Sequence, residues 1–288
     1  MTTSVYSHVS LPIERAIIAL VTALKGNRMT TINPLFVDLS HWDPAEDYET
    51  VKAEGIVAVV YKATEGQSYT DDTYVEQQHM AKSAGLKWGA YHFADSSDVY
   101  GQIDNFLRFA CPDPDELFCL DWEDNPSGAG CMSLADVKTW ITEVENALRR
   151  PGECVLYSGN TAKEALGDTV DEFLGARRLW LCQYGSNPTW QRSWSKYWAW
   201  QFTDGEYGPT PHSINGIGHC DINSYDEGAE RLIAEWASGS VPTRPPPAVR
   251  DVVTVLINAP PNVEVKVRRF SFDAPRRMHR GTEGEIDD

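Results

Sequence analysis

From residue 34 onward, the chain alternates short apolar runs with longer stretches whose apolar residues recur at helical spacing. The short runs are rich in β-branched and aromatic residues and are bounded by Gly, Pro, Asn or Asp, as strands are. The predicted strands are 35–39, 56–62, 87–93, 116–120, 154–157, 179–183, 197–202 and 219–222. Strands that alternate with helices predict a parallel sheet with crossover helices. Eight of them in about 205 residues predict a compact, closed α/β barrel.

This pattern changes on both sides of the predicted barrel. Residues 1–33 are a separate extension, in which apolar residues at helical spacing predict a short helix. Residues 239–250 are rich in proline and predict a semi-rigid linker. In the last part, 251–288, the runs 252–257 and 263–267 predict a short β-hairpin followed by a disordered end. An isolated hairpin is marginal in water, so we expect it to self-associate, dock on the barrel or attach to a larger particle.

Composition limits the classes of partner. The chain has 42 acidic and 25 basic residues and a net charge of −17, which argues against nucleic acid and against an anionic membrane surface. Its apolar runs fall short of the roughly 18 residues that membrane insertion requires. Ten Trp and twelve Tyr supply flat faces on which sugar rings stack, although a large aromatic core would use them equally well.

The six cysteines favour a structural role. Cys119, Cys154 and Cys182 lie in apolar runs, where free cysteine behaves as a small hydrophobe. The even number permits disulfides, but we expect reduced thiols in the core. Because no pair of Cys or His residues has the spacing of a zinc site, we expect no metal and no other cofactor.

Two acids end the fourth predicted strand. Side chains alternate along a strand, so Asp121 and Glu123 share one face at roughly 7 Å along the chain, while Trp122 points to the other. Their mutual repulsion separates their pKa values. Acid-catalysed cleavage of a glycosidic bond needs such a pair, one carboxyl protonated and the other ionised. Taken alone, the pair fits two solvated acids at a strand end just as well.

The ends of the other strands are also polar. The active site of a β/α barrel lies at the carboxyl ends of its strands, so these positions are candidates for chemistry. Asp38 lies near the end of the first strand and Asp221 near the end of the eighth. Because the first and last strands of a closed barrel are neighbours, we expect Asp38 and Asp221 to lie side by side.

Six motifs in a fixed order carry a family resemblance. They are Asp38-x-Ser40-x-Trp42, Lys62-Ala-Thr-Glu-Gly66, Gly89-Ala-Tyr-His-Phe93, Leu120-Asp-x-Glu123, Tyr157-Ser-Gly159 and Asp221-x-Asn223. Over residues 34–238 the chain resembles the family-25 glycoside hydrolases, the lysozymes of the Chalaropsis type. The resemblance implies an irregular TIM-like β/α barrel that cleaves the β-1,4 bond between N-acetylmuramic acid and N-acetylglucosamine in bacterial peptidoglycan. Tyr61 and Trp122 depart from the family pattern, away from the proposed catalytic positions.

The resemblance also implies roles for single residues. Glu123 is the general acid, and Asp38 and Asp221 complete an acidic floor. Asp121 either orients the N-acetyl group of the substrate, stabilises charge or attacks directly. Lys62 either meets a carboxylate of the muramic acid or pairs with Asp38 or Glu65. Further candidates for substrate binding are Tyr91, Tyr157, Tyr184, Trp200, Gln201 and Asn223, of which the aromatic members fit a core role as well.

Two functions from different classes follow from these observations. The first is a muramidase, expected to be a phage endolysin that stays in the host cytoplasm until a holin releases it to the wall, because a convincing signal peptide is missing. A virion-associated or secreted enzyme is the alternative location. The second is a catalytically inactive barrel that binds wall glycan or serves as a virion structural module. The presence of all four acids favours the enzyme.

Overall fold

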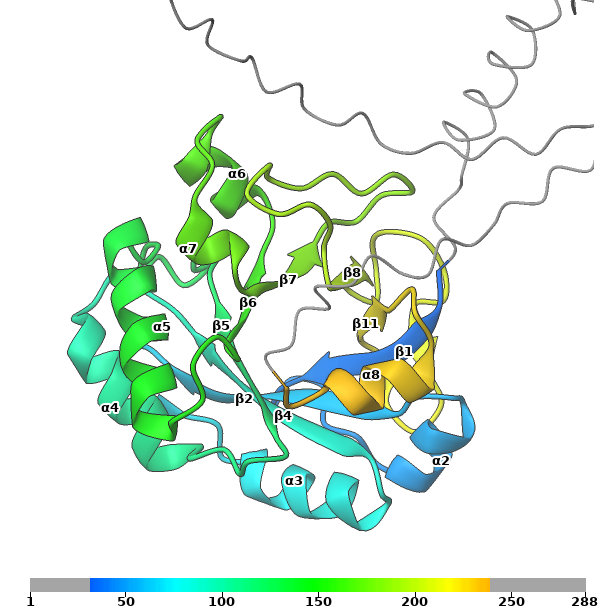
Figure 1. Ribbon diagram of the computed structural model, residues 1–288. Coiled ribbons are helices and arrows are strands. Elements are labelled where there is room, and N and C mark those ends of the chain that lie inside the picture. Colours follow the sequence, from blue (N-terminus) through cyan, green and yellow to red (C-terminus); the bar gives the residue numbers. More distant parts are fainter. Residues whose placement is uncertain (1–31, 239–288) are drawn as a thin grey trace, which may run out of the picture. The chain divides into compact units, whose positions relative to one another are not determined.

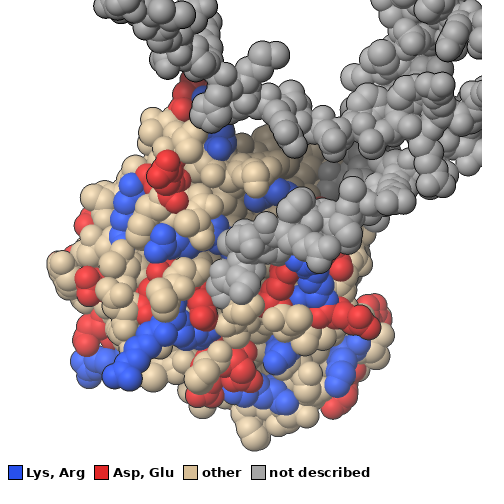
Figure 2. All heavy atoms as spheres, in the orientation of Figure 1, with Lys and Arg blue, Asp and Glu red and all other residues tan. Residues whose placement is uncertain are grey.

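The computed structural model describes residues 32–238 of the 288-residue chain. The predicted N-terminal helix, the proline-rich linker and the hairpin of 252–267 lie outside the described residues, so the proposed division into domains stays a prediction. Within 32–238, no helix is both long and apolar enough to cross a bilayer. Figure 2 shows acidic and basic side chains interspersed over the described part of the face drawn.

Eight strands close into a barrel (Figure 1). In order around the barrel they are β1 (Pro34–Leu39), β2 (Ala58–Glu65), β4 (Lys87–Phe93), β5 (Leu117–Asp121), β6 (Val155–Ser158), β7 (Arg178–Cys182), β8 (Ala199–Thr203) and β11 (Asp221–Ser224). The pairing of β1 with both β2 and β11 closes the ring. The short β3 (Tyr69–Thr70) pairs antiparallel with the end of β2. A separate hairpin is formed by β9 (Ser213–Ile214) and β10 (Gly218–His219). The predicted α/β barrel is therefore confirmed, with strand bounds shifted by a few residues.

The last barrel strand contradicts the prediction of an all-parallel sheet. Neighbouring strands from β1 to β8 run parallel, whereas β11 is antiparallel to both β8 and β1. The chain between β8 and β11 carries the β9–β10 hairpin where a crossover helix would have brought it back. Residues 183–198 between β7 and β8 form a loop in place of a helix. These two departures make the barrel irregular.

Helices α2 to α7 surround the barrel (Figure 1). Their bounds are α2 (Tyr48–Ala53), α3 (Tyr74–Ser83), α4 (Val99–Phe109), α5 (Leu134–Leu148), α6 (Asn160–Leu166) and α7 (Glu172–Gly175). Local capping starts several of them, because a side-chain oxygen accepts from a free N–H of the first turn. Asp98 caps α4 through the N–H of Gly101, and Ser133 caps α5 through the N–H of Asp136.

Alternation along each strand separates two cores. Outward-facing residues such as Val37, Leu120 and Leu156 pack beneath the surrounding helices. Inward-facing residues such as Phe36 and Val155 fill the barrel interior. The departures Tyr61 and Trp122 both face outward and are fully buried, so the outer core absorbs them. The next inward positions toward the carboxyl ends of the strands carry the polar side chains of the candidate site.

Helix α8 (Ala229–Glu235) closes the opposite end of the barrel. Leu232 and Trp236 pack into the interior core, and the indole N–H of Trp236 donates to the carbonyl of Trp88, near the start of β4, at 2.6 Å. Arg178, the first residue of β7, donates to the carbonyl of Trp236 at 3.2 Å. The barrel is thus closed at the amino ends of its parallel strands, which leaves the carboxyl ends for a pocket.

Candidate active site

A pocket of about 310 Å³ opens at the carboxyl ends of the parallel strands. Its walls carry six carboxyl groups in a small space: Asp38, Asp43, Asp121, Glu123, Asp204 and Asp221. All four predicted catalytic acids are among them. The prediction that strand ends one, four and eight converge is therefore confirmed by position, although their chemical roles need separate tests.

Asp121, the last residue of β5, and Glu123, two residues after that strand, both line the pocket, as side-chain alternation predicted. Trp122 between them is turned outward, where its backbone N–H donates to Tyr157 and its indole N–H donates to Met132, both at 2.9 Å. Burial and the negative charge of Asp38 raise the pKa of Glu123, and the positive charge of Lys62 lowers it. The net result is a pKa of about 7. Burial and the charge of Glu123 raise the pKa of Asp121 well above its usual value. Both carboxyls of the pair are therefore harder to ionise than carboxyls in water.

Asp38 and Asp221 are direct cross-strand partners in the β1–β11 ladder. The antiparallel direction changes how Asp221 reaches the pocket, because it is the first residue of β11 and not the last of a parallel strand. Burial raises the pKa of Asp38 to about 6. The pKa of Asp221 is raised well above its usual value by burial and by the charges of Asp38 and Asp43. The predicted proximity of the two acids is confirmed.

Two buried side-chain amides donate hydrogen bonds to the carboxylate of Asp38. Gln201 donates to one carboxylate oxygen at 2.9 Å and Asn223 donates to the other at 2.7 Å. The orientation of each amide is set by donors on its other side. The hydroxyls of Tyr157 and Tyr184 each donate to Gln201 at 2.8 Å, and the indole N–H of Trp180 donates to Asn223 at 2.6 Å. Asp38 is therefore held as an acceptor, which favours its ionised form.

Three of the predicted substrate-binding residues take other places. Trp200 is an outward-facing residue of β8, fully buried against Phe202 and Tyr197, so its assignment to substrate binding is wrong. Its indole N–H donates to the carbonyl of Gln183 at 2.7 Å. Gln201 and Asn223 face inward but are fully buried, and their amides are used on Asp38. They support a carboxylate and do not offer a free surface to a sugar.

The predicted tyrosines and Lys62 lie at the pocket. Tyr91 and Tyr157 line it, and Tyr184 is partly exposed above Gln201. Lys62 also lines the pocket and forms an ion pair with Glu65, so the pairing alternative describes this state of the molecule. The ammonium lies 4.8 Å from the ring centre of Phe93 and 5.3 Å from that of Tyr69, and both faces stabilise a cation.

Several pocket residues were not assigned from the sequence. Asp43 accepts from the backbone N–H of Ser40 at 2.8 Å, and burial raises its pKa to about 6. Asp204 follows β8 directly, so the strand-end rule that found Asp38 would have found it. Asp43 offers a weaker signal, because it follows the first motif in a turn whose direction the sequence does not reveal.

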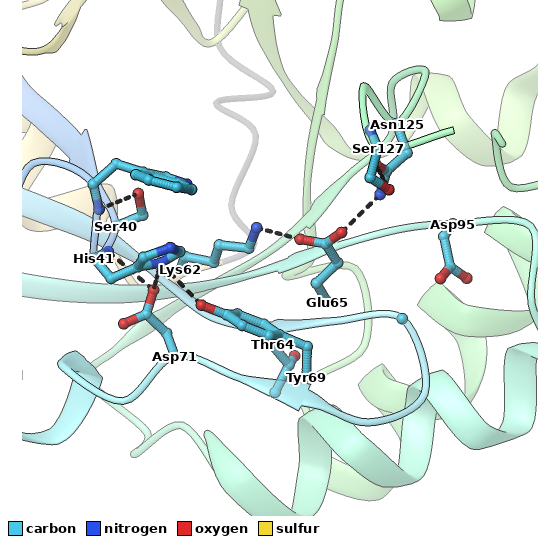
Figure 3. Close-up of polar contacts among 12 residues, drawn as sticks. Ser40, His41, Lys62, Thr64, Glu65, Tyr69, Asp71, Asp95, Asn125 and Ser127 are labelled. Atoms are coloured by element: carbon cyan, nitrogen blue, oxygen red, sulfur yellow. Dashed lines mark hydrogen bonds and ion pairs between the residues drawn. The ribbon is translucent and has the colours of Figure 1, made fainter. Parts of the chain in front are cut away.

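Trp42 is an exposed aromatic residue at the pocket, with 83% of its surface accessible. Its ring lies 4.6 Å from that of His41, whose Nδ1 is 2.8 Å from the carboxylate of Asp71 and 2.9 Å from the hydroxyl of Tyr69. Figure 3 shows His41, Asp71 and Tyr69 joined in this way. Burial opposes ionisation of Asp71, but hydrogen bonds from Thr73 and His41 outweigh it and lower the pKa of that carboxyl. The exposed indole of Trp42 therefore packs against a His41 ring that is held in place by its contacts with Asp71 and Tyr69.

The histidine of the third motif and the cysteines fit structural roles. His92 is fully buried between Thr64 and Gln102, at 2.7 and 3.0 Å, and burial lowers its pKa to about 4. All six cysteines are free thiols. Among residues 32–238, no cluster of three or more His, Cys, Asp or Glu side chains is arranged to hold a metal ion.

Comparison with known proteins identifies the family. The family model described as "Glycosyl hydrolases family 25" matches residues 37–210, which is more than half of the chain. The chain belongs to glycosyl hydrolase family 25. The matched part of this family-25 chain holds Asp38, Asp121 and Glu123, while Asp221 follows it.

Family-25 relatives extend the likeness to named proteins. Lysozyme M1 of Streptomyces globisporus is 28% identical over 69% of this chain and 69% of its own length. The autolytic lysozyme of Clostridium acetobutylicum is 31% identical over 67% of this chain and 56% of its own. The crystal structure of a bacterial lysozyme from Streptomyces coelicolor is 29% identical, with a TM-score of 0.61, and the match covers 72% of this chain and 98% of that one.

Proposed function

We propose that this family-25 chain is a muramidase that hydrolyses the β-1,4 bond between N-acetylmuramic acid and N-acetylglucosamine in peptidoglycan. The observation that carries the proposal is the Asp121/Glu123 pair, whose two carboxyls line one acidic pocket where burial raises the pKa of both. Hydrolysis of a glycosidic bond requires a proton for the leaving oxygen and a negative charge near the sugar carbon. Relatives named as lysozymes support the same substrate.

Glu123 donates the proton in this mechanism. It is the less buried member of the pair and lines the open pocket, whereas Asp121 is 7% exposed and its Oδ1 finds no hydrogen-bond partner among residues 32–238. An N–H from the 2-acetamido group of the substrate supplies a partner for Asp121. That hydrogen bond stabilises Asp121 as a carboxylate and leaves the shared proton on Glu123. Asp121 then faces the positive charge that develops at the anomeric carbon, either directly or through the acetamido oxygen.

Analysis of the products tests this function. Purified peptidoglycan is digested, the new reducing ends are marked with borohydride, and the fragments are identified by mass spectrometry. Reduced muramic acid at the new ends is the expected result. Reduced glucosamine would instead show a glucosaminidase, and cleavage of chitin without cleavage of peptidoglycan would show a chitinase.

The rival function, an inactive barrel that binds wall glycan, finds no support in the site. The four predicted acids meet in one pocket, and two amides hold Asp38 in the orientation of an acceptor. The role in phage lysis and the release from the host cytoplasm stay predictions. The same holds for the expected particle attachment or self-association of the C-terminal hairpin. Fractionation of infected cells, with the protein followed before and after lysis, tests them.

A further inference from the structure

Glu65 uses both of its carboxylate oxygens inside the molecule. Its Oε2 forms the ion pair with Lys62, and its Oε1 accepts from the side-chain amide of Asn125 at 2.9 Å. Figure 3 shows these two groups meeting Glu65 from opposite sides. Burial opposes ionisation, but the bonds from Asn125 and Lys62 and the charge of Lys62 outweigh it and lower the pKa of Glu65. Glu65 is therefore a fixed negative charge.

Asn125 connects this charge to the loop that carries Glu123. Asn125 follows Glu123 by two residues and is 4% exposed. Its side-chain oxygen accepts from the backbone N–H of Ser127 at 2.9 Å and from the Ser127 hydroxyl at 2.6 Å, so its NH₂ group must face Glu65. Glu65 thus ties the loop after β5 to the end of β2.

The backbone at the end of β2 leaves Glu65 little freedom. Gly66 has a φ of +51°, and a Cβ there would lie 2.3 Å from a carboxylate oxygen of Asp95. Just before Glu65, the hydroxyl of Thr64 lies 2.7 Å from Nδ1 of the buried His92. The close approach to Asp95 explains the glycine of the Lys62-Ala-Thr-Glu-Gly66 motif, and the contact with His92 explains its threonine. Glu65 lies between Thr64 and Gly66, so its position is fixed by both.

The charged and titratable groups around Glu123 come from five strands and one loop. They are Asp38 on β1, Lys62 on β2, Asp121 on β5, Tyr157 on β6, Cys182 on β7 and Cys131 in the loop after β5. Lys62 is the cation in this set, and its charge favours loss of the proton from both Glu123 and Asp121. Burial is the main reason why the pair holds its proton, and the Lys62 ammonium opposes it. A change in the position of this ammonium should therefore change how strongly the proton is held.

We propose that Glu65 is a positioning residue that holds the Lys62 ammonium away from the Asp121/Glu123 pair and anchors the Glu123 loop through Asn125. The inference rests on the proposed hydrolase function and adds a role to the Lys-Ala-Thr-Glu-Gly motif. With Glu65 in place, the ammonium is neutralised locally and the pair keeps its proton near neutral pH. Without it, Lys62 is left among the carboxyl groups of the pocket that it lines, the pair included, and the pair would lose the proton at a lower pH.

The test is the pH dependence of kcat/KM on a soluble peptidoglycan fragment for four proteins. These are the wild type, Glu65→Gln, Lys62→Met and the double variant. Glu65→Gln should move the alkaline limb down by about one pH unit, which is about a tenfold loss of activity above the limb. Lys62→Met should move the limb up. In the Lys62→Met background, Glu65→Gln should no longer move it, because its effect passes through the ammonium.

Asn125→Ala separates the two contacts of Glu65. It should lower kcat through the loosened loop while the alkaline limb stays in place, because the Lys62 pair remains. A matched control is Glu116→Gln, which breaks another Lys–Glu ion pair away from the pocket, between the buried Glu116 and the partly exposed Lys82 at 2.7 Å. Glu116→Gln should lower Tm without moving the limb.

The outcomes are distinguishable. A limb that stays in place in Glu65→Gln, or that moves equally in the Lys62→Met background, would overturn the positioning role. If Glu65→Gln does not fold, Lys62→Met alone still decides, since a limb that fails to rise would show that the Lys62 charge does not act on the pair, as the proposal requires. Failure of the proposed function looks different, because the wild type itself would then release no fragments that end in reduced muramic acid.

Discussion

At the scale of single residues, a substitution at Glu123 can test catalysis without disturbing the fold. Its side chain is partly exposed in the pocket, so Glu123→Gln keeps the shape and removes only the transferable proton. We expect kcat to fall by about 10²- to 10⁴-fold, because general acid catalysis contributes that range. Binding to insoluble peptidoglycan, measured by sedimentation, should be retained. Wall clearing at the wild-type rate would contradict the assignment of Glu123 as the acid.

The identity of the acids could be predicted from the sequence, but the supporting residues could not. Asp38, Asp121, Glu123 and Asp221 stand at or near the predicted strand ends, and six ordered motifs with a family resemblance singled them out as candidates. Trp200 was a candidate because an aromatic ring at a strand end can contact a sugar, and only the register of β8 reveals that it faces outward. Such register depends on pairing between distant strands, which a local pattern does not contain.

At the scale of elements, the loop between β1 and α2 presents Trp42 to solvent beside the pocket. Trp42→Ala should raise KM about 2- to 10-fold with little change in kcat, because stacking contributes about 0.5–1.5 kcal/mol and an indole carries no group that transfers a proton. Steady-state kinetics on glycan fragments of defined length measures the effect. Tyr100→Ala is the matched control, because that ring is also exposed but lies on α4, outside the pocket.

The junction of β6 and β7 depends on a glycine. A Cβ at Gly159 would lie 2.4 Å from the backbone carbonyl oxygen of Cys182, so Gly159→Ala must push the two strand ends apart. Such overpacking costs about 1–3 kcal/mol, which lowers Tm by about 3–10 °C in a domain of this size. Thermal unfolding measures the change. Gly185→Ala is the control, since a Cβ there meets no atom within 4 Å, and an equal loss of Tm in both would contradict the steric argument.

The direction of β11 shows where element prediction stops. The parallel strands β1 to β8 could be predicted, because apolar runs between amphipathic helices leave one common arrangement. The β9–β10 hairpin consists of two-residue strands that leave no periodic signal, and it replaces the crossover that a parallel last strand needs. Asp221 still reaches the pocket, because the same residue can begin an antiparallel strand or end a parallel one at the same edge.

At the scale of the whole molecule, the buried acids make stability depend on pH. Burial raises the pKa of Asp38 and Asp43 to about 6 and that of Glu123 to about 7. The folded state therefore binds more protons than the unfolded state between about pH 4 and 7, so stability falls as pH rises through this window. We expect a higher Tm at pH 5 than at pH 8. The net charge of −17 acts in the same direction through self-repulsion.

Asp43→Asn tests the contribution of one of these carboxyls. The amide cannot ionise and keeps an oxygen that can accept from Ser40, so the difference in Tm between pH 5 and pH 8 should narrow. Glu76→Gln, at an exposed position of α3, is the control and should leave that difference unchanged. A Tm that rises from pH 5 to pH 8 in the wild type would contradict the assigned pKa shifts.

The antiparallel last strand also decides which way a tethered enzyme would face. It carries the chain from the pocket back to the closed end, where Tyr225 donates to the carbonyl of Asn33 at 3.2 Å and Arg178 binds the carbonyl of Trp236. The described chain thus enters and leaves the barrel at the end away from the pocket. A support coupled at either residue 32 or residue 238 would point the pocket outward. That orientation suits an enzyme whose substrate is an insoluble polymer too large to diffuse behind it.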